Sequence, residues 1–399
     1  MIPIAPFSIA RLPHMVFGEG KITTVPSQVA SLGKRVLIMT GAQSFRATPY
    51  WEDLLQGLHR LGISWETELV TGEPSPEEID KVVQNYYHQD IEVVLGIGGG
   101  SVLDAAKAIA GLLRPGNSVM DHLEGVGKEI PYQGPATPFI AVPTTAGTGS
   151  EATKNAVLSR QGENGFKKSF RHDLLVPQLA IVDPNLLASC PADLLAANGM
   201  DAFTQLLESY VSTRANPLTD ALAISGMTAF RDGFFPVWEG KDSAAVSAGR
   251  SQIAYAALLS GITLAQTGLG SVHGLASPLG AFFPCPHGVV CGTLVAEATE
   301  INIIALQQRL PENIALIKYA QVGELLAKRS FTKPQEALNS LVKILRIWTD
   351  QLALPKLRVF GMQLTDLDKV VSHSRGSSMK TNPIELTAME LRELLERRW

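Results

Sequence analysis

The hydrophobic pattern of the sequence changes near residues 184–191, and this change separates two kinds of fold. Before it, short β-branched segments alternate with amphipathic segments of helix length. Such alternation favours βαβ units and a mainly parallel sheet. The expected strands are 35–40, 64–70, 92–97 and 139–142, and the expected helices between them are 51–61, 77–87 and 102–113.

After Pro191 the pattern is almost entirely helical, because apolar residues recur with the period of an α-helix. The expected helices are 192–212, 218–230, 243–261, 289–308, 334–351 and 383–398. A chain of 399 residues also exceeds what one hydrophobic core usually organises. We therefore predict two domains, an α/β domain over 1–188 and an all-α domain over 189–399.

Composition narrows the class of protein. Lys and Arg number 34 against 38 Asp and Glu, a net charge of −4 that argues against a nucleic-acid partner. No apolar run approaches the length of a membrane span, and residues 1–15 lack the charged and apolar regions of a signal peptide. Three scattered cysteines, Cys190, Cys285 and Cys291, are too few for a disulfide framework. We expect a reduced, cytoplasmic protein that binds neither nucleic acid nor a membrane.

A glycine-rich turn stands at 98–101, between an expected strand and an expected helix. Glycines let the backbone approach a phosphate closely, and the N–H groups at the helix start supply donors. The turn is neither GxGxxG, because Ser101 replaces the third glycine, nor a Walker A loop, so a ligand-free turn remains an alternative. A second polar loop, 143–150, follows the strand 139–142. Two such loops at the carboxyl ends of parallel strands form a dinucleotide-binding crevice.

A second group of residues has metal-binding chemistry. Asp201 and Gln205 are four residues apart on an expected helix, so their side chains share one face. His273 and His287 flank a segment rich in Gly and Pro, which we expect to be a loop. Imidazole and carboxylate suit Zn²⁺ or Fe²⁺. From the spacing alone, a packing role for His273 and a surface-turn role for His287 remain open.

The motifs GGGS-x₂-D-x₂-K, PTTAGTGSE, GMDA, HGLASPLGA and PHG occur in that order. Together they resemble the iron-type (group III) alcohol dehydrogenases over essentially the whole chain. The resemblance implies a dehydroquinate synthase-like fold, with an N-terminal dinucleotide-binding α/β domain and an all-α C-terminal domain. It also implies NAD or NADP, Fe²⁺ with Zn²⁺ as the alternative, a small alcohol or aldehyde as substrate, and a homodimer.

Site residues follow from the resemblance. Asp201, His273 and His287 fall on three of the family's four metal-ligand positions, and Gln205 occupies the fourth, which is histidine in well-studied members. Ser277 stands where the family has a proton-relay histidine. The implied catalytic residues are thus Asp201, His273, His287 and Ser277. The implied cofactor-binding residues are Gly41, Gly98, Gly99, Gly100, Ser101, Asp104, Thr144, Thr145, Thr148, Asn155 and Lys167.

The choice between NAD and NADP depends on the residue after the first strand of the pattern. There, NAD-selective members carry an acid that binds the ribose 2′-OH and repels a 2′-phosphate. This chain has Gly41 at that position, no carboxylate over 40–44, and Arg46 nearby. The sequence therefore favours NADPH, or the use of both cofactors.

Three other functions fit parts of the pattern. A metal-free reductase of the maleylacetate reductase type would show no metal dependence, and a dehydroquinate synthase-like lyase would release phosphate without net redox change. A non-enzymatic dinucleotide-binding regulator would turn nothing over. Because three ligand positions are intact, we favour a metal-dependent NAD(P)-linked alcohol dehydrogenase or aldehyde reductase, which transfers hydride between nicotinamide and substrate.

Overall fold

A computed structural model describes residues 4–162 and 164–399. They form two compact units, one comprising 10–160 and 165–191 and the other comprising 192–399 with short segments at 4–9, 161–162 and 164. The first unit is built on a parallel sheet and the second is helical, which confirms the predicted fold class. The helical stretch begins three residues after the predicted boundary at 188/189.

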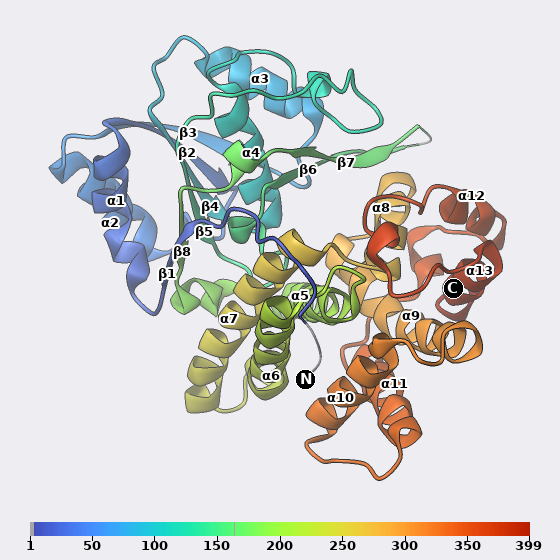
Figure 1. Cartoon of the computed structure of the whole chain (residues 1–399). Helices are drawn as coiled ribbons and strands as arrows, with labels where there is room; N and C mark the ends of the chain where they lie inside the picture. Colours follow the sequence, from blue (N-terminus) through green and yellow to red (C-terminus); the bar gives the residue numbers. More distant parts are fainter. Residues whose placement is uncertain (1–3, 163) are drawn as a thin grey trace. The chain divides into compact units, whose positions relative to one another are not determined.

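Among the described residues, six parallel strands form one sheet in the order β1–β8–β5–β4–β2–β3 (Figure 1). Their bounds are β1 His14–Phe17, β2 Arg35–Gly41, β3 Ser64–Val70, β4 Val93–Gly98, β5 Phe139–Pro143 and β8 Leu179–Val182. The four predicted strands, β2, β3, β4 and β5, are present within one residue at each end. β1 and β8 were not predicted, because each is only four residues long and so carries a weak pattern.

Helices cover both faces of this sheet, and their bounds are α1 Val25–Leu32, α2 Pro49–Arg60, α3 Pro76–Tyr86 and α4 Gly100–Leu112. Successive strand residues point to opposite faces. Leu37 and Met39 accordingly pack in the core with α3 and α4, whereas Val36 and Ile38 pack in the core with α1 and α2. Burial on both faces explains why these strands read as continuous apolar runs.

An antiparallel hairpin, β6 (Asn155–Arg160) and β7 (Phe166–Arg171), belongs to the same unit. Sequence reasoning missed it because Lys167 and Lys168 interrupt the apolar pattern of β7. Phe166 and Phe170 are nevertheless buried in the core that contains α4. The hairpin therefore extends the hydrophobic core on that side of the sheet.

The helices of the second unit are α5 Ala192–Val211, α6 Pro217–Glu239, α7 Ser243–Thr267, α8 Ser271–Phe282, α9 His287–Arg309, α10 Ile314–Ala327, α11 Pro334–Gln351, α12 Leu367–Ser372 and α13 Ala388–Arg397. α9 is long and apolar enough to cross a membrane, but 83% of its most apolar window is buried among its neighbours. Its composition is that of a core helix, which packs against α5, α8 and α11.

Two expectations about the helical unit were wrong. The segment 273–287 is not a loop throughout, because 273–282 lie in α8, which continues through Pro278. Dense burial of α8 outweighs the hydrogen bond that proline removes. The last helix begins at Ala388 rather than at 383, since Thr387 and Glu390 form a capping box at its start.

Candidate functional site

The predicted cofactor residues gather at one edge of the parallel sheet. β2, β4 and β5 end at Gly41, Gly98 and Pro143. β2 pairs with β3 on one side and β4 on the other, so the direction of strand addition reverses there. Ligands of open α/β sheets bind at such reversals, outside the carboxyl ends of the strands.

The two polar loops at this edge touch, and their contact requires glycine. A Cβ atom on Gly100 would lie 2.7 Å from Thr148 Oγ1, and one on Gly99 would lie 3.3 Å from Thr145 Oγ1. Within the described part of the chain, no side chain caps α4 at Gly99. The first N–H groups of α4 therefore remain available to an anion, and this cradle fits a dinucleotide pyrophosphate.

Beneath the loops lies a buried polar cluster centred on Lys107, which sequence reasoning did not select. Lys107 Nζ donates to Ser150 O and Oγ at 2.8 Å each, to Thr153 Oγ1 at 3.0 Å and to Asn155 O at 2.7 Å. Asp104 Oδ1 accepts a hydrogen bond from Ser150 and lies 3.7 Å from Lys107 Nζ. These contacts bind the second loop to α4. The D-x₂-K spacing in the sequence was the signal for this pair.

Burial shifts the titration of this cluster. It lowers the pKa of Lys107 to about 8, against the opposing charge of Asp104. Burial also raises the pKa of Asp104 and raises that of Glu151 to about 7. Asp104 is thus engaged with protein groups below the cradle.

The remaining predicted cofactor residues are distributed as follows. Ser101 is the second residue of α4, and the amide of Thr144 donates to Gly98 O at 3.0 Å, so both belong to the loop edge. Asn155 opens β6, where its carbonyl oxygen accepts from Lys107. Lys167 on β7 forms an ion pair with Glu73.

In the helical unit, Asp201 of α5, His273 of α8 and His287 of α9 meet at one point, together with Cys291 of α9. One ligand atom from each lies within 4.8 Å of the others. Asp201 Oδ1 is 3.2 Å from His273 Nε2 and 3.7 Å from His287 Nε2. The structure therefore brings together three of the four residues that the resemblance implies as metal ligands.

Glu208 supports this group and was not predicted. Its Oε2 atom lies 2.6 Å from His273 Nδ1, and its Oε1 atom accepts from the Val272 amide at 2.7 Å. A carboxylate on Nδ1 directs the other nitrogen, Nε2, toward the ligand group. The available signal was that Glu208 lies seven residues after Asp201, two helical turns along the same face of α5.

The group fits a divalent cation. Asp201 Oδ2 is buried and has no hydrogen-bond partner among the residues that the structure describes. A buried carboxylate oxygen without a partner is costly unless a cation or a donor satisfies it. Burial raises the pKa of Asp201, but the His287 and His273 imidazoles outweigh burial and hold the pKa below its usual value. Carboxylate and imidazole are suitable ligands for Fe²⁺ or Zn²⁺.

Gln205 and Ser277 each follow a member of this group by one helical turn. Gln205 is buried on α5, one turn after Asp201, and its Oε1 atom accepts from Ser260 Oγ at 2.8 Å. Ser277 is half-buried and lies four residues after His273, so both share one face of α8. Cys291 was overlooked, although it lies one turn after His287 in the sequence.

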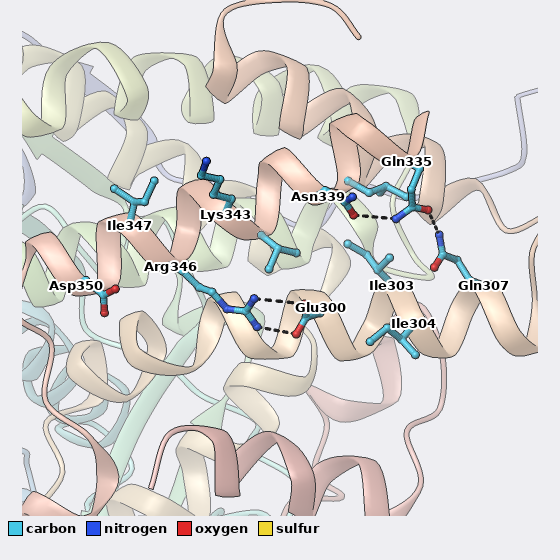
Figure 2. Close-up of a pocket in the computed structure, with 12 residues that line it drawn as sticks. Glu300, Ile303, Ile304, Gln307, Gln335, Asn339, Lys343, Arg346, Ile347 and Asp350 are labelled. Carbon is cyan, nitrogen blue, oxygen red and sulfur yellow. Dashed lines mark hydrogen bonds and ion pairs between the residues drawn. The ribbon is translucent and has the colours of Figure 1, made fainter. Parts of the chain in front are cut away.

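A separate pocket of about 390 Å³ lies between α9 and α11 (Figure 2). Arg346 pairs there with Glu300, and Gln335 bridges Gln307 and Asn339. Its polar lining is thus largely paired with itself. None of the predicted site residues lines this pocket.

Comparison with known proteins identifies the family. Residues 13–184 match the family described as iron-containing alcohol dehydrogenase, and residues 195–399 match the C-terminal part of the same family. The chain therefore belongs to the iron-containing alcohol dehydrogenase family. The expected fold, alcohol dehydrogenase activity and NAD(P) and iron as the family's cofactors are confirmed at this level.

Individual relatives agree with this assignment. Alcohol dehydrogenase 4 of Saccharomyces cerevisiae is 32% identical over 77% of this chain and 76% of its own length. The 1-propanol dehydrogenase of Citrobacter freundii is 32% identical over 82% and 83%. A solved structure of 1,3-propanediol oxidoreductase superposes with a TM-score of 0.86 at 26% identity, covering 99% of this chain and 100% of its own.

Proposed function

We propose that the chain is a metal-dependent dehydrogenase that prefers NADP(H) and interconverts a small primary alcohol with its aldehyde. The observation that carries this proposal is the buried Asp201 Oδ2 atom without a partner, beside the imidazoles of His273 and His287. A buried carboxylate oxygen without a partner is costly, and a divalent cation held by the same residues would satisfy it. The unpartnered oxygen favours this proposal over a metal-free reductase, in which the polar atoms of the group would be expected to satisfy one another without a cation.

Each residue has a defined task in this reaction. When bound, a divalent metal would supply Lewis acidity for the substrate oxygen, and the nicotinamide would supply or accept the hydride. Asp201, His273 and His287 bind the metal, and Glu208 orients His273 through its Nδ1 atom. We assign the proton transfer that accompanies hydride movement to the Ser277 hydroxyl, which shares a face of α8 with His273.

The glycine cradle holds the dinucleotide in this proposal. The N–H groups at the start of α4 donate to the pyrophosphate, and Thr145 and Thr148 line the facing loop. The proposed substrate class follows the named relatives, which act on 1-propanol and 1,3-propanediol. Both compounds are three-carbon primary alcohols.

Arg46 supports the preference for NADP. Its Nε atom donates to Thr40 Oγ1 at 2.8 Å, at the end of β2, and its guanidinium lies 4.6 Å from the centre of the Trp51 ring. Its NH2 nitrogen is buried without a hydrogen-bond partner in the described residues. A preorganised guanidinium with an unused donor suits a phosphate group.

The cofactor preference is tested by the ratio of kcat/KM for NADPH to that for NADH. We expect Arg46→Ala to lower this ratio by about 10- to 100-fold, the effect of losing a charge-assisted hydrogen bond of about 1.5–3 kcal/mol. Arg60→Ala, on an exposed position of α2, is the matched control and should leave the ratio unchanged. An unchanged ratio in Arg46→Ala would contradict the assignment.

We further propose a cytoplasmic homodimer. The described cysteines form no disulfide with one another, which is typical of a protein in a reducing compartment. β1 is an edge strand, and its Met15 and Phe17 side chains are exposed, so it offers a template for a second copy. Light scattering on the purified protein tests the dimer, and a monomer at micromolar concentration would refute it.

The central experiment is elemental analysis of protein purified anaerobically without chelator, with His273→Ala in parallel. We expect a stoichiometric metal in the wild-type protein and none in the variant. Oxidation of short primary alcohols with NADP, and reduction of the aldehydes with NADPH, should follow the metal content. Turnover that persists in metal-free protein would instead identify a metal-free reductase.

A further inference from the structure

We propose that Cys291 is the fourth protein ligand of the metal, in place of Gln205, and that the site therefore favours zinc over iron. This inference rests on the proposed function only in that the site holds a metal. The proposed ligand set is Asp201, His273, His287 and Cys291.

The distances from the Cys291 sulfur to the two imidazoles are close to those of a tetrahedral site. With Zn–N and Zn–O bonds of about 2.0–2.1 Å and a Zn–S bond of about 2.3 Å, neighbouring ligand atoms lie about 3.3–3.6 Å apart. Cys291 Sγ lies 3.6 Å from His273 Nε2 and 3.8 Å from His287 Nε2. These two distances are close to those expected across a shared metal ion.

Packing of α9 on α5 brings Cys291 to this position. A Cβ atom on Gly288 would lie 2.5 Å from Ala197 O, and one on Gly292 would lie 2.8 Å from Met200 Cβ. The two glycines thus allow close approach of α9 to α5 on either side of Cys291. His287 and Cys291, four residues apart, are then presented together to the carboxylate that follows Met200 on α5.

Gln205 is a weaker candidate for the fourth metal ligand. Its Oε1 atom already accepts a hydrogen bond from Ser260 Oγ at 2.8 Å. A neutral amide is also a poorer ligand for a borderline-soft cation than a thiolate is. Asp201, by contrast, belongs to the group that contains the thiol, and its Oδ1 atom lies 3.2 Å from His273 Nε2 and 3.7 Å from His287 Nε2.

Thiolate ligation has two chemical consequences. Binding of the divalent ion releases the thiol proton to solvent, so one sulfur–hydrogen bond is exchanged for one sulfur–metal bond without oxidation or reduction. The ligand set then carries two negative charges, from Asp201 and Cys291, which together balance the charge of the ion. Soft sulfur ligands select zinc and related ions over iron in a mixed site.

The test uses the full-length protein loaded with Co²⁺, whose thiolate complexes absorb strongly in the near ultraviolet by charge transfer. We expect this band in the wild-type protein and its loss in Cys291→Ser. Cys285→Ser, which removes another buried thiol outside the group, is the matched control and should retain it. Gln205→Ala should also retain the band.

Zinc affinity, measured by competition with a chelator, gives a second readout. We expect Cys291→Ser to weaken zinc binding by at least tenfold and Gln205→Ala to change it less than threefold. X-ray absorption on the zinc-loaded wild type needs no variant and should show one sulfur neighbour at about 2.3 Å.

Two results would overturn the inference, namely a cobalt-loaded wild type without the charge-transfer band, or a zinc site with only nitrogen and oxygen neighbours. Either would leave the proposed dehydrogenase function intact, with Gln205 as the fourth ligand. Conversely, a protein with the cobalt–thiolate band but no alcohol oxidation would retain the ligand set and refute the function.

Discussion

Two buried polar clusters, one in each unit, differ in whether the protein completes them. Around Lys107, every contact is made by the chain itself, since Nζ donates to four oxygen atoms of three residues. Around Asp201, one carboxylate oxygen lacks a partner among the described residues. A complete buried network stabilises a fold, whereas an incomplete one indicates a ligand.

The two clusters also differ in what they hold in place. Lys107 binds Ser150, Thr153 and the start of β6, so it holds the second loop against the helix that begins in the glycine cradle. Its effect on cofactor binding is indirect, through the position of a loop. Asp201, in contrast, is itself a member of the candidate metal-ligand group. Substitutions at Asp201 should therefore impair metal binding, whereas substitutions at Lys107 should impair stability.

The largest effect is expected for Asp201→Asn. The amide keeps the shape of the side chain but removes the charge that binds the cation, so metal retention and turnover should fall to background. Wild-type protein at a metal concentration of 100 times the Kd should gain about 2.7 kcal/mol of stability, and the variant should gain none. Thermal unfolding with and without metal measures this difference. Retained metal-dependent stabilisation in the variant would place the cation elsewhere.

Lys107→Met should destabilise the protein by about 3–5 kcal/mol, because it leaves the buried Asp104 carboxyl group without its ion-pair partner and four oxygen atoms without their donor. Denaturant unfolding should show this loss equally with and without metal. The folded variant should still bind metal stoichiometrically. A loss of metal at full folding would indicate that the two clusters are not independent.

The pH dependence of stability should show the titration of Glu151, because burial raises the pKa of its carboxyl group to about 7. Between its ordinary pKa of 4.5 and about 7, the folded protein keeps a proton that the unfolded chain has released. Its contribution to stability is therefore present below pH 4.5 and is lost as the pH rises to about 7. Glu151→Gln should abolish this loss, which amounts to about 3 kcal/mol. Unfolding free energies of both proteins at pH 5, 6 and 7 give the comparison, and parallel curves would contradict it.

Glu208→Gln should produce the smallest effect, a 10- to 100-fold loss of metal affinity, since it weakens the acceptor for His273 Nδ1 without removing a ligand. Chelator competition measures the affinity. Glu297→Gln, in the ion-pair network of α9 with Arg346, is a control of the same chemistry outside the ligand group. Equal affinities for Glu208→Gln and wild type would show that Glu208 serves only the backbone of α8.

The sequence was informative where a local pattern has one structural outcome. Strands buried on both faces produce apolar runs, and glycines between a strand and a helix indicate a close approach, so β4 and its loop were predictable. Asp201, His273 and His287 were found through motifs that resemble a known family. Their convergence is a property of how α5, α8 and α9 pack, which no single segment encodes.

What the sequence could not provide depends on contacts between distant segments. In the sequence, Lys107 and Glu208 have no feature that sets them apart from other charged helix residues. Their roles come from contacts with distant segments, because Lys107 donates to Asn155 of β6 and Glu208 contacts His273 of α8. α8 was mistaken for a loop, because Gly274, Pro278 and Gly280 are poor helix formers and only tertiary burial offsets them. Helix propensity is a local property, whereas the conformation of these residues depends on packing against distant segments.

The first turn of α8 has a cap that comes from other parts of the chain. Gly270 supplies no capping side chain, and instead Asn382 accepts from the Ser271 amide while Glu208 accepts from the Val272 amide. Since the Glu208 carboxylate also holds His273, opening of this turn would release an imidazole from the ligand group. Occupation of the group should therefore slow hydrogen exchange of the α8 amides, so that the end of one helix reports whether an ion is bound.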